Sequence, residues 1–115
     1  MSDASTEFRE PSIQEVRLLR AAAGRWPASP PDWVQQVIVR SMKDGGMGSL
    51  ELLLPESPGR DRIFGGRVAE LQFRDEDGVD VIVSLNVDQD QRPFELDIWK
   101  TDFSPLKGIP EGLDQ

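Results

Sequence analysis

Carboxylates are the residues of this sequence best placed to do acid-base chemistry, and many of them gather in one stretch. From Asp75 to Ile98, acidic residues far outnumber basic ones, because Arg92 is the only cation there. The acidic residues are Asp75, Glu76, Asp77, Asp80, Asp88, Asp90, Glu95 and Asp97. Histidine, cysteine and tyrosine are absent. Serine and cysteine nucleophiles activated by histidine are therefore excluded, as are the usual zinc ligand sets, and proton transfer would depend on Asp, Glu or a perturbed Lys.

Paired carboxylates such as Glu95 with Asp97, or Asp80 with Asp97, could divide the roles of general acid and general base. That division needs an enclosed environment that pushes two pKa values apart. Hydrated carboxylates on an open sheet offer no such enclosure. We therefore favour a binding surface over a catalytic site, and we expect no catalytic residue, no cofactor and no metal site.

Strict alternation of apolar residues places a set of mostly polar side chains on one side of the predicted sheet. Burial of Val81, Val83 and Leu85 turns the residues between them to the opposite face, and the same holds around Leu96 and Ile98. If a short Asp88 to Gln91 turn sets the register, Ser84 lies opposite Glu95, Ile82 opposite Asp97, and Asp80 opposite Trp99. An apolar centre with a charged rim is typical of a protein interface. The predicted surface consists of Asp80, Ile82, Ser84, Glu95, Asp97 and Trp99.

A glycine-rich segment, Asp44 to Ser49, is the second candidate site. Its glycines permit positive φ, so exposed backbone amides could hold an anion, assisted by arginines of the loop that follows. A phosphate-binding loop leads into a helix, however, whereas this segment leads into an apolar strand, so a hairpin turn is the favoured interpretation. The candidate ligand contacts are Gly45, Gly46, Met47, Gly48, Arg60 and Arg62.

The elements that must position these residues begin with one helix. Ser12 and Glu15 have the spacing of a capping box, and Gly24 supplies a stop. The predicted apolar stripe of this helix is Ile13, Val16, Leu18, Leu19, Ala22 and Ala23. The prolines between Trp26 and Trp33 predict a stiff linker.

Five strands follow in the prediction. Residues 34–42 and 50–54 form a hairpin around the glycines, and 55–66 form a loop. Residues 67–74, 79–87 and 94–98 alternate with a period of two, and the turns between them are too short for parallel crossovers. We predict an α+β fold in which the N-terminal helix packs on one antiparallel meander of about five strands, with a cystatin-like shape. The predicted domain covers residues 11–110, between flexible ends at 1–10 and 111–115.

Length and charge restrict the class of protein. A chain of 115 residues suits one domain with one core. The formal net charge of -8 opposes binding to nucleic acid or to anionic membranes and favours a basic partner. No secretory signal or apolar span is evident, so we expect a cytoplasmic protein. The oligomeric state cannot be inferred from these features.

Two segments carry a family resemblance. Asp44 to Leu50 (DGGMGSL) and Phe94 to Leu106 (FELDIWKTDFSPL) resemble an uncharacterised family of small bacterial domains over about residues 11–110. The resemblance implies a fold, but no activity and no catalytic residues. In size, charge and makeup the chain is also broadly similar to the immunity proteins of bacterial toxin systems.

The leading hypothesis is thus a small acidic module, immunity-like or regulatory, that binds a basic protein through the sheet face around Trp99. The alternative is a protein that binds a small ligand or anion, or a carboxylate-dependent enzyme, using the glycine-rich hairpin. A mimic of nucleic acid is a third possibility, based on charge alone.

Overall fold

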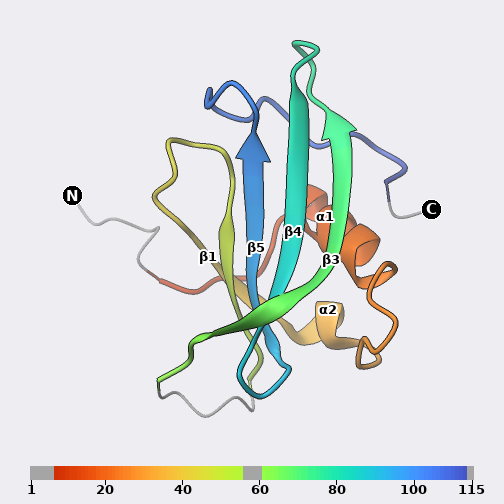
Figure 1. Ribbon diagram of the computed structural model, residues 1–115, viewed down its shortest axis with the longest axis vertical. Coiled ribbons are helices and arrows are strands. Elements are labelled where there is room, and N and C mark those ends of the chain that lie inside the picture. Colours follow the sequence, from red (N-terminus) through yellow and green to blue (C-terminus); the bar gives the residue numbers. More distant parts are fainter. Residues whose placement is uncertain (1–6, 56–60, 114–115) are drawn as a thin grey trace.

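The computed structural model describes residues 7–55 and 61–113. In order along the chain these form α1 (Ile13–Ala23), α2 (Trp33–Gln36), β1 (Ile38–Ser41), β2 (Leu50–Leu53), β3 (Phe64–Arg74), β4 (Asp80–Asp88) and β5 (Pro93–Lys100). All strands pair antiparallel in one sheet of order β1-β2-β5-β4-β3. The predicted α+β class, with an N-terminal helix on an antiparallel sheet of five strands, is confirmed (Figure 1). The predicted meander is wrong at one connection, because β2 pairs with β5 rather than with β3.

The capping box starts α1 as predicted. The Glu15 amide donates to Ser12 Oγ at 3.1 Å, and the Ser12 amide donates to Glu15 Oε1 at 2.8 Å. The predicted apolar stripe is wrong at Ile13, which is 74% exposed. At about 100° per residue, Ile13 lies on the side of the helix opposite to Leu18 and Ala22, which are fully buried.

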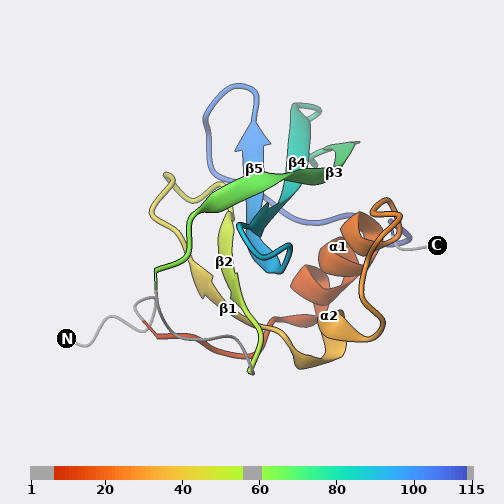
Figure 2. The ribbon, with the colours of Figure 1, turned by 60° about the horizontal axis from the view of Figure 1, so that its bottom comes forward.

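Both helices lie on the same side of the sheet, which bends around α1 (Figure 2). The core fills this side with the alternating residues of β3, β4 and β5, as the period of two predicts. Its strand residues include Ala69, Leu71, Phe73, Val81, Val83, Leu85, Leu96 and Ile98. In the described part of the chain, no helix lies on the opposite side of β4 and β5.

The segment between α1 and β1 differs from the prediction in two ways. Residues 34–36 belong to the short helix α2 rather than to a strand, so β1 begins only at Ile38. The proline-rich linker also contributes to the core, because Trp26 and Trp33 are buried with ring centroids 6.3 Å apart. The Trp33 indole donates to Ser29 Oγ at 2.8 Å, which satisfies the polar end of the ring.

β3 begins earlier than predicted, at Phe64 rather than Arg67. The residues that break the sequence pattern are accommodated by irregularities in the pairing with β4, between Phe64 and Gly66 and between Arg67 and Ala69. A Cβ on Gly65 would lie 2.2 Å from the Asp88 carbonyl oxygen, so only glycine fits there. In the described part of the chain, no helix is long and apolar enough to cross a membrane.

The two ends of the described chain both contact the hairpin strands. Arg9 pairs with Val39 through two backbone hydrogen bonds of 2.8 Å at the outer side of β1. After β5 the chain runs extended, and the Leu106 amide donates to the Gly46 carbonyl at 3.0 Å. The expectations for residues 1–6 and 114–115 lie outside the described residues.

Candidate functional site

The residues predicted to form a partner surface do share one face. Asp80, Ile82 and Ser84 of β4 and Glu95, Asp97 and Trp99 of β5 alternate with core residues and lie on the side of the sheet away from α1. We call these six residues the open face.

The predicted register between the two strands is wrong by two residues. Ile82 lies opposite Trp99, Ser84 opposite Asp97, and Asn86 opposite Glu95. A shift of two keeps every side chain on its own face, so the composition of the open face is unchanged. The apolar pair Ile82 and Trp99 is now a direct cross-strand contact rather than a diagonal one.

Two features of the chain cause this shift. The turn holds one residue more than predicted, because the Asp88 carboxylate accepts the amides of Asp90 at 2.8 Å and Arg92 at 3.1 Å. An irregularity between Asn86 and Val87 then leaves Phe94 without a residue opposite. Each of the two features shifts the pairing of β4 with β5 by one residue from the predicted register.

Carboxylates of the open face differ in whether a cation neutralises them. Asp80 lies 3.5 Å from Arg74, and Glu51, directly opposite Glu95 on β2, is paired with Arg40 at 2.9 Å. Among the described residues, no cation forms an ion pair with Glu95 or Asp97. Burial raises the pKa of Glu95, and the charges of Asp97 and Glu51 add to that effect. A hydrogen bond with Asn86 and the charge of Arg62 lower the pKa of Glu95 by less, and no ion pair among the described residues neutralises Glu95 or Asp97.

An exposed aromatic pair lies beside these carboxylates. The Trp99 side chain is 43% exposed, and the Phe103 ring, which is 69% exposed, lies 6.2 Å from it between ring centroids. Ile82 faces Trp99 from β4. Phe103 was absent from the predicted surface because it follows the strand and no period assigns it to a face.

The turn that presents Phe103 is held in place against its backbone preference. Phe103 has a φ of 64°, a left-handed conformation that is unfavourable for a bulky residue. Its amide donates to the Lys100 carbonyl at 2.8 Å, and the Thr101 amide donates to the Asp80 carbonyl at 3.0 Å. The Asp102 carboxylate then accepts the Ser104 hydroxyl at 2.6 Å. The fold thus fixes an exposed phenyl ring that contributes little to the core.

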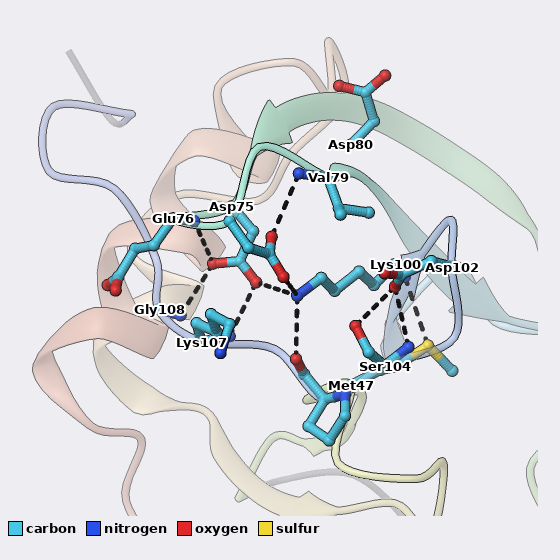
Figure 3. A network of polar contacts seen from close by, with 12 residues as sticks. Met47, Asp75, Glu76, Val79, Asp80, Lys100, Asp102, Ser104, Lys107 and Gly108 are labelled. Atoms are coloured by element: carbon cyan, nitrogen blue, oxygen red, sulfur yellow. Dashed lines mark hydrogen bonds and ion pairs between the residues drawn. The ribbon is translucent and has the colours of Figure 1, made fainter.

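Beneath this turn lies a buried ion network that the sequence analysis missed (Figure 3). Lys100 Nζ lies 2.8 Å from Asp75 and 2.7 Å from Asp77, and it also donates to the Pro105 carbonyl at 3.1 Å. Asp75 accepts the amides of Lys107 at 2.8 Å and Gly108 at 3.2 Å. We call these six residues the Lys100 network. It joins the β3–β4 turn and the end of β5 to the C-terminal segment.

The alternation of residues along β5 could have indicated this network. Lys100 occupies the inward position that follows Leu96 and Ile98, where a lone cation cannot remain unpaired. Burial opposes the charged form of Lys100, but its hydrogen bonds to Asp75 and Asp77 outweigh burial, so its pKa is raised. The acidic turn at 75–77 is the part of the sequence able to supply two carboxylates.

The glycine-rich segment forms the predicted hairpin turn between β1 and β2. Two of its backbone amides donate to the carboxylate of Asp44, at the start of the same segment. Asp44 accepts the amides of Met47 at 3.0 Å and Ser49 at 2.9 Å. Gly45, Gly46 and Gly48 all have positive φ. Gly46 also contacts the C-terminal segment, since a Cβ there would lie 3.3 Å from Pro105. Anion binding by this turn stays a prediction.

Arg62 bridges three strands at the other end of the sheet. Where β2 and β5 diverge, its guanidinium donates to the Leu52 carbonyl at 3.0 Å and to the Pro93 carbonyl at 2.7 Å, and it pairs with Asp88 at 3.1 Å. These contacts occupy the group that was predicted to hold an anion. Arg60 lies outside the described residues, so that prediction remains untested.

Comparison with known proteins assigns the chain to a family. The model of the family described as "Domain of unknown function (DUF6984)" matches residues 8–110. The chain belongs to this family. The match spans the open face, the Lys100 network and the hairpin, and the expected membership of an uncharacterised family is confirmed. No curated protein matches the chain. No solved structure matches it, so the cystatin-like shape stays a prediction.

The carboxylates of the described residues are not arranged as a metal site. Within residues 7–55 and 61–113, no group of three Asp or Glu side chains is placed to hold a metal ion. Asp75 and Asp77 are directed to Lys100, and Asp88 is directed to Arg62 and to its own turn.

Proposed function

We propose that the protein is a binding module that recognises a partner protein with a basic surface through the open face and Phe103. The observation that carries this proposal is the exposed pair Trp99 and Phe103 beside Glu95 and Asp97, two carboxylates with which no cation of the described residues forms an ion pair. Aromatic anchors with polar neighbours are typical of interface centres. We place such a protein among immunity-like or regulatory modules.

The aromatic pair supports a binding role because the fold gains little from it. A solvent-facing phenyl ring on a left-handed residue costs backbone energy without filling the core. Contact with a partner would bury both rings. A turn already fixed by Asp80, Lys100 and Asp102 would lose little conformational entropy in that contact.

The charge pattern supports a basic partner. Glu95 lies opposite Glu51 and on the same face as Asp97, so these carboxylates repel one another in the free protein. A partner cation would relieve that repulsion. The net charge of -8 would also speed the encounter with a positively charged surface.

The experiment is affinity capture from a native lysate, analysed by mass spectrometry, with three forms of the protein. The binding variant combines Asp97→Lys with Trp99→Ala. A matched control combines Asp90→Lys with Phe64→Ala, which changes an exposed carboxylate and a 58% exposed ring away from the open face. Far-ultraviolet circular dichroism checks that all three fold.

We expect one protein, held by the wild type and by the control, to be lost with the binding variant and to dissociate as salt rises. Capture of the same proteins by all three forms would refute the proposal. A small molecule retained by the wild type alone would favour the alternative function as a ligand-binding protein.

A further inference from the structure

Two arginines of this chain share one arrangement. Arg40 stacks over the Phe8 ring, 4.4 Å from its centroid, while it pairs with Glu51 at 2.9 Å. Arg62 stacks over the Phe94 ring, 4.9 Å from its centroid, while it pairs with Asp88 at 3.1 Å. In both cases one guanidinium satisfies an aromatic face and a carboxylate together.

The open face presents the same two partners without the arginine. Trp99 and Asp97 are two residues apart on β5, so their Cα atoms are about 6.8 Å apart on one face. Both residues are exposed. Among the described residues, no cation stacks on the Trp99 ring and none pairs with Asp97. Within residues 7–55 and 61–113, the one hydrogen bond of the Asp97 carboxylate comes from Ser49 Oγ, at 3.4 Å.

We propose that Trp99 and Asp97 form a subsite for an arginine side chain supplied by the partner protein. This inference rests on the proposed function and names the chemistry of its central contact. The guanidinium stacks on the indole, and its N–H groups donate to the Asp97 carboxylate. Phe103 borders the indole on one side, and Ser84, opposite Asp97, provides a hydroxyl at the other.

Arginine fits this pair better than lysine for a geometric reason. A planar guanidinium can lie flat on a ring while its edge donates two parallel hydrogen bonds to a carboxylate. A lysine ammonium is a compact, strongly hydrated charge that gains less from stacking. The subsite therefore prefers arginine to lysine, although the two side chains carry the same charge. Attraction by net charge alone would not distinguish them.

The test is a titration followed by NMR, in which the three tryptophans serve as separate reporters. Trp26 and Trp33 are buried, whereas Trp99 is 43% exposed, so only the Trp99 indole signal should respond at this face. The probes are the capped tripeptides acetyl-Gly-Arg-Gly-amide, its lysine counterpart and its citrulline counterpart. Citrulline keeps the planar shape of arginine but removes the charge.

We expect the arginine peptide to shift the Trp99 indole signal with an affinity at least threefold above that of the lysine peptide, and the citrulline peptide to cause no shift. Asp97→Asn should weaken arginine binding about fivefold, while Asp90→Asn, an equal loss of charge on the distant turn, leaves it unchanged. Because Asp97 is exposed, its amide variant is expected to fold.

Equal binding of the arginine and lysine peptides, or arginine binding that survives Asp97→Asn, would overturn the subsite. The proposed function has its own test, since it fails only if lysate capture survives the combined change of Asp97 and Trp99. A protein partner lost with that variant, together with indifferent tripeptide binding, would retain the function and reject the subsite.

Discussion

Lys100 Nζ lies 2.8 Å from a carboxylate oxygen of Asp75, and neither side chain is exposed to solvent. The pair joins the strand that carries Trp99 to the turn between β3 and β4. Through Asp75 it also holds the amides of Lys107 and Gly108. A buried charge pair thus fixes the C-terminal segment on the α1 side of the sheet, across from the open face.

Removing the cation should destabilise the whole protein. Lys100→Met keeps the length of the side chain but removes the counter-charge of Asp75, which is buried, and of Asp77, which is partly exposed. We expect Tm to fall by on the order of 10 °C. Lys43→Met, at an exposed position, is the matched control and should leave Tm within about 2 °C. Equal Tm values for the two variants would show that the network adds no stability.

Acid should weaken the same contact. Burial opposes ionisation of Asp75, but Lys100 and the amides of Lys107 and Glu76 outweigh it and lower the pKa from 3.8 to about 2. Because the folded pKa lies below the unfolded one, this stabilisation is present above about pH 4 and is lost as the pH falls toward 2. Urea unfolding between pH 2 and 5 measures the loss.

Asp75→Asn should reduce that acid dependence, since one of the carboxyl groups with a lowered pKa is gone. Asp90→Asn should keep it. Lys100 predicts a second loss at the alkaline end: its folded pKa is raised above 10.5, so its contribution is complete below about pH 10.5 and is lost as the pH rises from there through the folded value. An acid slope unchanged by Asp75→Asn would contradict the assignment.

Two glycines of the hairpin separate the cost of backbone strain from the cost of pressing on the C-terminal segment. Gly45 and Gly46 have similar positive φ, 76° and 82°, but a Cβ on Gly45 would meet nothing within 4 Å, whereas one on Gly46 would press on Pro105. Each alanine substitution should cost about 1 kcal/mol of strain. Gly46→Ala should cost about 1 kcal/mol more. If urea unfolding gave the same loss of unfolding free energy for both variants, the C-terminal segment would move away from the added methyl group at no cost.

Glu95 should favour binding at the expense of stability. Burial and the charges of Asp97 and Glu51 raise its pKa against a hydrogen bond with Asn86 and the charge of Arg62, so the ionised form is less stable in the folded protein than in the unfolded chain. Glu95→Gln should therefore raise the free energy of unfolding slightly, by at most about 0.5 kcal/mol because solvent screens the repulsion. The same variant should weaken capture of the basic partner. Lower stability together with unchanged capture would refute both expectations.

Local patterns in the sequence were sufficient to predict most helices and strands and to assign the side chains of β4 and β5 to the two faces of the sheet. Ser12 and Glu15 define the start of α1 because a capping box needs only residues three positions apart. The alternation around Val83 and Ile98 assigns each side chain to a face because the backbone pleat itself has a period of two. These properties assigned the six residues of the open face to one side of the sheet even though the predicted register was wrong.

Only the tertiary structure decided what depends on contacts between distant segments. The register follows from an extra turn residue bound by Asp88 and from the unpaired Phe94, which no period reports. Phe103 reaches Trp99 only through a left-handed turn, and Lys100 meets Asp75 only because β5 ends beside the β3–β4 turn. Alternation predicts where a side chain points, but the partner it meets depends on how the strands are joined and aligned.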